Sequence, residues 1–241
     1  MAKKQRLDVA MVERGLAPSR EKARALILAG DVRVDGRTET RAGAGVGDGT
    51  AIEVERPQRF VSRGGEKLDH ALAAFGIHVA GRVALDVGSS TGGFTDCLLQ
   101  WGAARVYAVD VGYGQLHQRL RADPRVIVME RTNIRDLDAL PGRPSLATVD
   151  ASFISLTKVL SPVIALVAPG ADIVALVKPQ FEAERHEVRR GVVRDPLVHA
   201  AVIGRVAWWC VQQGLRVRGV AASPLLGPAG NREFFLWLRA P

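Results

Sequence analysis

Glycine and hydroxyl residues gather between positions 88 and 95, directly after the apolar residues 83–85. Apolar residues at helical spacing follow them, from Phe94 to Trp101. This order predicts a buried strand, a tight loop and the start of a helix. Glycines in such a loop let the chain turn sharply and let a ligand lie against bare backbone. The segment is therefore a candidate ligand site at the carboxyl end of a strand.

A carboxylate ends the next apolar segment, where Asp110 follows residues 106–109. An acid in this position accepts hydrogen bonds from the two hydroxyls of a ribose. The loop lacks the middle glycine of the dinucleotide pattern Gly-x-Gly-x-x-Gly, and Asp86 would repel a phosphate. Both features favour a ligand with a ribose, an amine and a positive charge, which S-adenosyl-L-methionine combines. A plain strand-to-helix turn is the alternative interpretation.

The residues expected around this ligand come from the loop and from the ends of the following strands. They are Asp86, Gly88, Ser89, Ser90, Thr91, Gly92, Gly93, Phe94, Asp110, Val111, Asn133 and Asp150. Within this set, Asn133 follows the third predicted strand, where a side chain is placed to meet the adenine.

Apolar segments alternate with helical patterns from residue 82 onward. Strands are predicted near residues 82–87, 105–109, 125–129, 146–150, 171–177, 215–222 and 233–238. The alternation predicts an α/β fold, a Rossmann-like parallel sheet with helices on both faces. Residues 182–195 are charge-rich and weakly patterned, which predicts a mobile loop. Trp208 and Trp209 lie in an apolar helical pattern and are interpreted as packing residues.

Four charged residues that are far apart in the sequence fall at the ends of predicted strands and helices. Lys67 lies in the first turn of a helix that Gly76 ends, and Asp150 and Lys178 follow the fourth and fifth strands. Glu233 begins the last strand. In this type of fold the carboxyl ends of the strands form one crevice, so the four side chains are predicted to meet at one rim.

The first 58 residues have a different pattern. Two short helices are predicted before Gly15 and Gly30, with Ser19 as the N-cap of the second. Residues 32–38 predict a hairpin with an Asp-Gly turn. Residues 56–65, with Gly64 and Gly65, predict a linker. We therefore expect a small α+β domain at 1–58, a linker at 59–65 and a second domain at 66–241.

Residues 5–56 resemble the RNA-binding domain first seen in ribosomal protein S-four, also called the α-L motif. The matching positions are Arg6, Leu7, Asp8, Gly15, Ser19, Arg20, Ala23, Leu26, Ile27, Gly30, Val32, Val34, Gly36, Gly47 and Asp48. The resemblance implies RNA contacts from the second helix and the hairpin edge, and guanidinium groups suit phosphates. The candidate RNA-binding residues are Arg6, Arg20, Lys22, Arg24, Arg37 and Arg63. A solvated charged face is the alternative interpretation.

Composition favours a polyanionic partner. The 241 residues carry a net charge of +8 and a pI of about 10.2, as nucleic-acid-binding proteins do. Cys97 and Cys210 both lie in helical patterns and form neither a disulfide framework nor a metal-binding spacing. The sequence shows no signal peptide and no apolar stretch long enough to cross a bilayer. These features predict a cytoplasmic protein without stable membrane association.

The four charged residues resemble the Lys-Asp-Lys-Glu tetrad of the FtsJ-like 2′-O-ribose methyltransferases. With its N-terminal domain, the whole chain is similar to the TlyA/haemolysin A family of rRNA methyltransferases. The shared segments include Ser62-Arg63-Gly64-Gly65-x-Lys67-Leu68, Asp110-Val111-Gly112-Tyr113-Gly114-Gln115-Leu116, Ser152-Phe153-Ile154-Ser155-Leu156 and Val177-Lys178-Pro179-Gln180-Phe181-Glu182, besides the glycine loop. All four tetrad positions are filled.

The resemblance implies S-adenosyl-L-methionine-dependent methylation of a ribose 2′-hydroxyl, with cytidine in ribosomal RNA as substrate and ribosomal RNA or ribosomal subunits as partner. Lys178 would act as base or hydroxyl orienter, and Asp150 would orient Lys178 and face the sulfonium. Lys67 and Glu233 would position the ribose. The chemistry calls for no metal.

Three other interpretations compete with this one. A structural ion-pair network would also collect these charges. A membrane-active haemolysin is suggested by the family's older name, although the sequence offers no insertion segment. The third is an RNA-binding or ribosome-assembly protein without catalysis, in which we would expect one or more of the four tetrad residues to be replaced.

Overall fold

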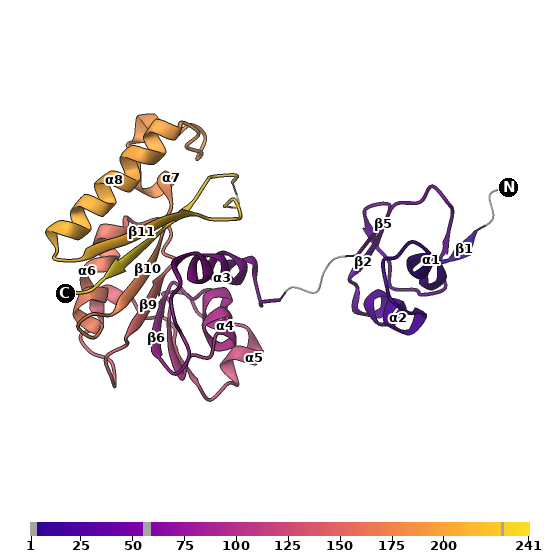
Figure 1. The fold of residues 1–241 in the computed structure, drawn as a ribbon, viewed down its shortest axis with the longest axis horizontal. Coiled ribbons are helices and arrows are strands. Elements are labelled where there is room, and N and C mark those ends of the chain that lie inside the picture. Colours follow the sequence, from indigo (N-terminus) through magenta and orange to yellow (C-terminus); the bar gives the residue numbers. More distant parts are fainter. Residues whose placement is uncertain (1–3, 55–58, 228) are drawn as a thin grey trace. The chain divides into compact units, whose positions relative to one another are not determined.

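The computed structural model describes residues 4–54, 59–227 and 229–241. The chain divides into two compact units, residues 1–58 and 59–241 (Figure 1). Each unit has its own hydrophobic core, so each is described by itself.

The first unit is a small α+β domain. Its elements are β1 (Gln5–Arg6), α1 (Leu7–Glu13), α2 (Arg20–Ala29), β2 (Val32–Val34), β3 (Arg37–Thr38), β4 (Gly45–Val46) and β5 (Ile52–Val54). As predicted, Ser19 caps α2 by accepting a hydrogen bond from the Lys22 amide, and β2 and β3 form a hairpin. Asp35 and Gly36 both have positive φ at its tip, as the turn between twisted strands requires.

A seven-stranded sheet forms the second unit, in the order β11-β12-β10-β9-β6-β7-β8. The strands are β6 (Val83–Val87), β7 (Arg105–Val109), β8 (Val126–Met129), β9 (Leu146–Val149), β10 (Asp172–Val177), β11 (Arg216–Ala222) and β12 (Phe234–Arg239). The helices are α3 (Arg63–Phe75), α4 (Gly93–Gln100), α5 (Gln118–Arg121), α6 (Leu156–Leu166), α7 (Pro179–Glu182) and α8 (Pro196–Gln212), with 3-10 turns η1 (Ile134–Asp136) and η2 (Arg185–Glu187).

The sheet is mixed, whereas the sequence pattern predicted a parallel one. Strands β6 to β10 pair in parallel, but β12 is antiparallel to both β10 and β11. The reason lies in the connection from β11 to β12, whose described residues 223–227 and 229–233 form no crossover helix of the kind that a parallel connection needs. The alternation of helices and strands in the sequence does not predict that the last connection is short, and so it does not predict the antiparallel direction of β12.

Helices cover both faces of the sheet, as predicted (Figure 1). Successive strand residues point to opposite faces, so Ala84 belongs to the core under α3 and α4 while Leu85 belongs to the core under α6 and α8. Cys97 of α4 and Cys210 of α8 are buried free thiols, one in each of these cores.

The predicted linker over residues 59–65 differs from the structure. Phe60 is buried against Gly65, where a Cβ atom would overlap its ring, and α3 already begins at Arg63. Asp96 accepts a hydrogen bond from the Val61 amide. These residues therefore belong to the second unit, and Lys67 lies one turn into α3. Residues 55–58, the rest of the predicted connection, lie outside the described residues.

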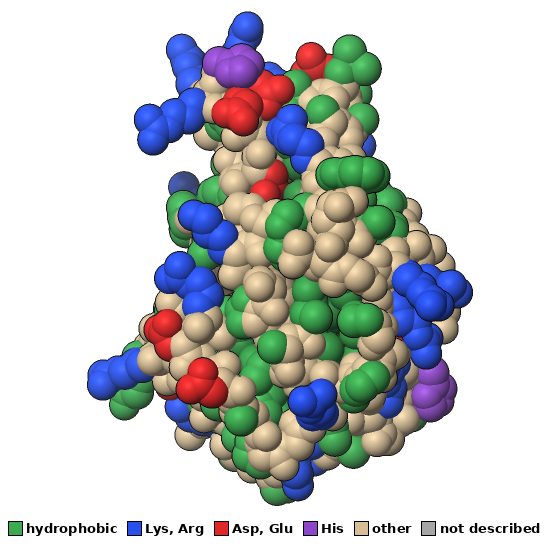
Figure 2. Space-filling view, turned by 90° about the vertical axis from the view of Figure 1, so that its left-hand side faces the viewer, with side chains coloured by type: hydrophobic (Ala, Val, Ile, Leu, Met, Phe, Trp, Pro, Cys, Tyr) green, Lys and Arg blue, Asp and Glu red, His purple; other side chains and the backbone are tan. Residues whose placement is uncertain are grey.

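Helix α8 corrects the interpretation of Trp208. Its buried face is formed by His199, Val202, Val206 and Cys210. Trp208 lies two positions from Val206 and so points away from this face, with 67% of its surface exposed, whereas Trp209 packs on the core. Apolar side chains accordingly reach the surface on the side of the unit that carries α8 (Figure 2).

The segment predicted as a mobile loop has defined local structure. It contains the end of α7, the turn η2 and an isolated bridge between Arg189 and Val192. The Val193 amide donates to the Asn231 side chain, which also donates to the Gly191 carbonyl. This segment is thereby tied to the loop that leads into β12.

Candidate active site

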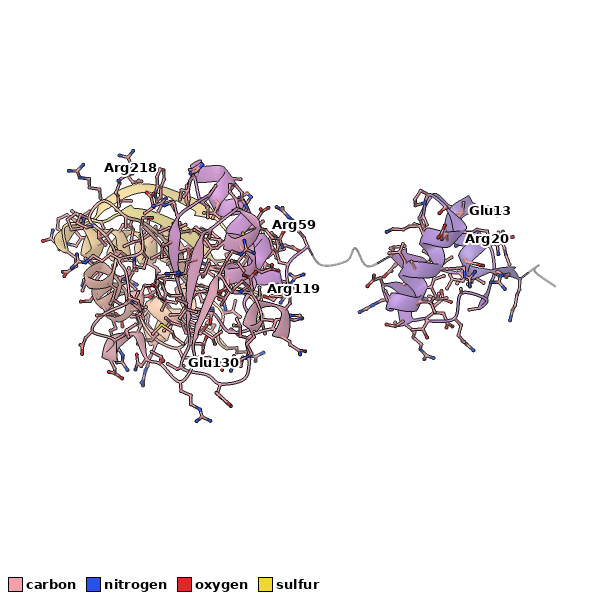
Figure 3. The ribbon with its side chains drawn as sticks, turned by 90° about the horizontal axis from the view of Figure 1, so that it is seen from below. Glu13, Arg20, Arg59, Arg119, Glu130 and Arg218 are labelled. Atoms are coloured by element: carbon pink, nitrogen blue, oxygen red, sulfur yellow. The ribbon has the colours of Figure 1, made fainter. Side chains whose placement is uncertain are left out.

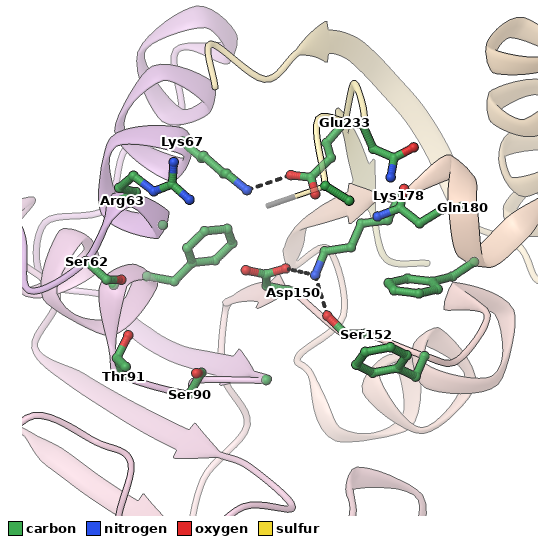
Figure 4. A pocket seen from close by; sticks show the side chains of 18 of the residues that line it. Ser62, Arg63, Lys67, Ser90, Thr91, Asp150, Ser152, Lys178, Gln180 and Glu233 are labelled. Atoms are coloured by element: carbon green, nitrogen blue, oxygen red, sulfur yellow. Dashed lines mark hydrogen bonds and ion pairs between the residues drawn. The ribbon is translucent and has the colours of Figure 1, made fainter. Parts of the chain in front are cut away.

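The four charged residues predicted to meet line one cavity of about 590 Å³ in the second unit (Figure 4). Lys67 comes from α3, Asp150 follows β9, Lys178 follows β10 and Glu233 precedes β12. They form two ion pairs, with 2.6 Å between Lys67 Nζ and Glu233 Oε2 and 2.7 Å between Lys178 Nζ and Asp150 Oδ1. Opposite charges are thus balanced within each pair.

Strand topology explains why these residues meet. Strands β9 and β10 are parallel neighbours, so Asp150 and Lys178 leave the same edge of the sheet. In the antiparallel pairing of β10 with β12, Val177 lies opposite Phe234, so the next residues, Lys178 and Glu233, continue that register. The antiparallel strand that the sequence pattern missed is therefore what brings Glu233 to the cavity.

Burial gives the two pairs different surroundings. The Glu233 carboxylate is buried and Lys67 is largely covered, whereas the Asp150 side chain is 24% exposed. Charges in such partly desolvated positions interact more strongly than at the surface. The Lys178–Asp150 pair therefore lies where a ligand in the cavity can reach it.

The glycine loop packs directly against the Asp150 backbone. Gly88 has φ +83°, and a Cβ atom there would lie 2.5 Å from the Asp150 carbonyl oxygen. Gly92 also has positive φ, at the N-cap of α4, and side chains of Leu116 and Leu120 fill the space that its Cβ would need. Both positions exclude larger residues for reasons of backbone conformation and close contact.

A second cavity of about 490 Å³ adjoins the first. Five residues line both: Gly88, Ser90, Asp150, Ser152 and Phe153. The second cavity is also lined by the predicted ligand residues Asp110, Val111 and Asn133. Asp110, Val111 and Asn133 therefore share the second cavity with Gly88 and Ser90, while the two ion pairs line the first cavity.

Backbone contacts hold the polar side chains of the second cavity in place. Asp110 accepts hydrogen bonds at 2.7 Å from the amides of Ser90 and Gly112, one on each oxygen. Each carboxylate oxygen has a second lone pair, so the side chain keeps capacity for ribose hydroxyls. Asn133 caps η1 through its side-chain oxygen, which accepts from the Arg135 amide.

Two of the predicted ligand residues do not line either cavity. Asp86 is fully buried, and its carboxylate accepts hydrogen bonds from Thr95 and Thr148 at 2.6 and 3.0 Å. Burial raises the pKa of Asp86 to about 7. Gly92 packs against the side chains of Leu116 and Leu120. The remaining loop residues Ser89, Ser90, Thr91, Gly93 and Phe94 line the first cavity.

Sequence reasoning missed residues directly after Asp150. Ser152 Oγ accepts a hydrogen bond from Lys178 Nζ at 2.6 Å. Phe153 has φ +63° and is 91% exposed, with its ring 5.0 Å from that of Phe181. Two signals were available: their position immediately beyond a strand-ending carboxylate, and their place in a segment shared with the family, to which no role was assigned. An exposed aromatic ring at a cavity rim is able to stack on a base.

The candidate RNA-binding residues have different environments. Arg6 and Arg20 are both bonded to the buried carboxylate of Asp8, and the Arg6 hydrogen bond lowers the pKa of Asp8 to about 2. Arg20 is labelled in Figure 3. Lys22, Arg24 and Arg37 are exposed. Arg63 is exposed and lines the first cavity, so it sits with the candidate active site instead of the first unit.

A family model described as FtsJ-like methyltransferase matches residues 60–240, and one described as S4 domain matches residues 5–52. Over 244 residues the chain is 51% identical to the 16S/23S rRNA (cytidine-2′-O)-methyltransferase TlyA of Mycobacterium tuberculosis, which covers 99% of this chain and 91% of that protein. The chain belongs to the TlyA family of FtsJ-like methyltransferases.

The chain is also similar to another curated protein and to solved structures. The putative rRNA methyltransferase YqxC of Bacillus subtilis is 49% identical over 100% of this chain and 87% of its own length. A solved structure described as a putative hemolysin from Streptococcus thermophilus is 41% identical, with a TM-score of 0.77 over 100% of this chain and 90% of that one. A methyltransferase from Listeria monocytogenes, 14% identical with a TM-score of 0.55 over 75% of this chain and all of that one, shares the fold alone.

Two kinds of feature are absent from the described residues. No helix there is both long and apolar enough to cross a membrane. No group of three or more His, Cys, Asp or Glu side chains there is arranged to hold a metal ion.

Proposed function

We propose that this chain methylates the ribose 2′-hydroxyl of cytidine in ribosomal RNA, with S-adenosyl-L-methionine as methyl donor. The observation that carries the proposal is the Lys178–Asp150 pair on the wall between two adjoining cavities. One cavity has the character of a nucleoside site, and the other holds a lysine that can take a proton. The name of the M. tuberculosis relative supports cytidine in 16S and 23S rRNA as the target.

The second cavity fits the donor. Asp110 has free lone pairs for a ribose, Asn133 offers an amide, and Val111 and Ile134 supply apolar surface for an adenine. Gly88 presents bare backbone where the two cavities meet. When bound, S-adenosyl-L-methionine supplies a methyl group on a positively charged sulfur, and this sulfur is the leaving group that keeps the electrons of the carbon–sulfur bond.

Lys178 is assigned the proton transfer. Its amine accepts the proton of the ribose hydroxyl while the hydroxyl oxygen bonds to the methyl carbon. Asp150 holds the amine at 2.7 Å and stabilises the ammonium that forms. Lys67, fixed by Glu233, presents a cation to the ribose and neighbouring phosphate. Holding hydroxyl and methyl group in line supplies much of the acceleration.

The RNA is bound by both units in this proposal. The S4 domain presents Lys22, Arg24 and Arg37 on its surface, and Arg63 lies at the cavity itself. Ribosomal RNA or ribosomal subunits are the expected partner, which implies a cytoplasmic place of action.

The test is methylation of ribosomal subunits that lack these modifications, followed by digestion of each rRNA and mass spectrometry of the nucleosides. We expect 2′-O-methylcytidine with the wild-type chain and none with Lys178→Ala. Lys178→Arg is expected to be equally inactive in single turnover, because arginine keeps the charge but does not release its proton in proteins.

Three results would count against the proposal or a part of it. Methyl groups found only on bases, or no methylation, would reject the function. Wild-type rates in Lys178→Arg would reject Lys178 as base and leave it an orienting cation. Dye release from phospholipid vesicles by the purified chain would instead favour the membrane activity that the name hemolysin suggests.

A further inference from the structure

The amine of Lys178 has a neighbour outside the four charged residues. Ser152 Oγ accepts a hydrogen bond from Lys178 Nζ at 2.6 Å, while Asp150 Oδ1 lies 2.7 Å from the same nitrogen. Ser152 is exposed and lines both cavities. The hydroxyl therefore contacts the amine at the place where donor and RNA would meet.

A neutral amine has two N–H bonds and one lone pair, arranged as a tetrahedron around nitrogen with its Cε bond. Ser152 accepts one N–H in a hydrogen bond and the Asp150 carboxylate attracts the other through the ion pair, which leaves one direction for the lone pair. With Asp150 as the one partner, the lone pair could occupy either of the two tetrahedral positions that do not face the carboxylate. Ser152 thus limits Lys178 to orientations whose lone pair points away from both partners.

The loop that carries Ser152 is held by the segment that follows Lys178. Glu182 of α7 accepts hydrogen bonds from the Leu156 amide at 2.6 Å and from Ser155 Oγ at 2.8 Å. This fixes the loop just beyond Phe153, whose left-handed backbone is unfavourable for a residue with a side chain. The positions of the Lys178 amine and the Ser152 hydroxyl are therefore coupled through α7.

We propose that Ser152 is a positioning residue for methyl transfer, which orients the lone pair of Lys178 toward the ribose hydroxyl. The inference rests on the proposed role of Lys178 as base. In the reaction the hydroxyl proton moves to that lone pair, and the resulting ammonium keeps its ion pair with Asp150 and its hydrogen bond to Ser152 before it returns the proton to water.

The experiment compares Ser152→Ala, Ser152→Thr and Ser161→Ala in single-turnover methylation across pH, with affinities for S-adenosyl-L-methionine and RNA measured separately. Thr keeps the hydroxyl. Ser161 lies on the exposed side of α6 and controls for removal of a serine. Arg63, Lys67, Asp150 and Glu233, the charged groups that line the same cavity, are unchanged in every variant.

We expect the rate of Ser152→Ala to fall about 10- to 100-fold, a misorientation effect, at unchanged affinities. Its pH–rate profile should move to lower pH, because the ammonium then has one acceptor fewer. Ser152→Thr should recover most of the rate, and Ser161→Ala should match the wild type. A purely structural role would instead weaken binding and leave the pH profile in place, which would overturn the proposal, as would an unchanged rate in Ser152→Ala.

Lys178→Arg, measured in the same assay, separates this inference from the proposed function. If Lys178→Arg is inactive and Ser152→Ala is not impaired, Lys178 remains the base and only the role of Ser152 is rejected. If Lys178→Arg is active, the base assignment fails first and the role of Ser152 fails with it.

Discussion

Asp86 and Asp150 are carboxylates at the ends of two neighbouring parallel strands, but their environments differ. Asp86 is fully buried, and its carboxylate accepts hydrogen bonds from the hydroxyls of Thr95 and Thr148. Asp150 is partly exposed and pairs with Lys178. A buried carboxylate without a cation favours its neutral form, whereas a paired one is stabilised as an anion. Asp86 is therefore a structural residue and Asp150 a candidate functional one.

The raised pKa of Asp86 predicts a pH dependence of stability. In the folded chain its pKa is about 7, above the ordinary value of 3.8, so the folded state binds a proton more tightly than the unfolded state. This stabilisation is complete below pH 3.8 and is lost as the pH rises through 7. Asp86→Asn removes the titrating group but keeps polar atoms opposite both threonines.

We expect the wild type to lose stability relative to Asp86→Asn from about pH 4 to about pH 7, by on the order of 2–4 kcal/mol, and to show little further loss above that. Urea unfolding of both proteins at each pH measures the difference, in which the titrations of all other groups cancel. A difference that does not vary with pH would show that Asp86 does not titrate in this range.

At the scale of elements, the glycine loop connects the two cavities because it lies against the end of β9. Gly88 follows β6 and contacts the Asp150 carbonyl, while Gly81 precedes the same strand. Both have positive φ, +83° and +75°, but a Cβ atom at Gly81 would meet nothing within 4 Å. Substitution of Gly81 therefore tests the effect of backbone strain alone, whereas substitution of Gly88 tests backbone strain together with the close contact to Asp150.

Substituting alanine at each position tests the role of this contact. Both Gly81→Ala and Gly88→Ala are expected to lose about 1–2 kcal/mol of stability from the left-handed backbone. Only Gly88→Ala should also displace the loop from Asp150, and its affinity for S-adenosyl-L-methionine should fall at least about 10-fold. Calorimetry measures the affinity. Equal affinities in the two variants would mean that the loop position does not depend on this contact.

At the scale of the whole molecule, the positive charge is not concentrated in the S4 domain. Residues 1–58 contain 11 Lys and Arg against 9 Asp and Glu, whereas residues 59–241 contain 22 against 16. The larger share of the net charge of +8 therefore belongs to the methyltransferase unit. RNA binding by the first unit must then depend on where its cations lie, since its net charge is small.

Two double variants of the full chain test this point. Lys22→Ala with Arg24→Ala removes two exposed cations of α2, and Arg105→Ala with Arg143→Ala removes two near the amino ends of β7 and β9, opposite the cavities. Both lower the net charge from +8 to +6. We expect only the α2 variant to weaken rRNA binding. A plot of the logarithm of its binding constant against the logarithm of salt concentration should have a slope smaller in magnitude by about one for each phosphate that is no longer neutralised.

Cofactor affinity should be unchanged in both double variants, because neither pair of residues lines the second cavity. Equal reductions of RNA affinity in the two variants would show that binding follows net charge alone. Filter binding over a range of salt concentrations makes the comparison.

The sequence alone determined the two-domain order, most strand positions, the glycine loop and the identity of the four charged residues. The strands, turns and loop follow from periodicity and turn chemistry, which are local properties of the chain, and the set of four charged residues follows from the resemblance to the FtsJ-like tetrad. Local patterns also predicted the Ser19 cap and the hairpin at Asp35 and Gly36, both confirmed by the structure.

Only the tertiary structure decided how these residues are used. The short connection before β12 makes that strand antiparallel and carries Glu233 to Lys67. Packing against β9 and α4 buries Asp86, and the outer face of α8 exposes Trp208. The turn at Phe153 sets Ser152 against Lys178. Burial and partnership depend on segments distant in sequence, so no local pattern specifies them.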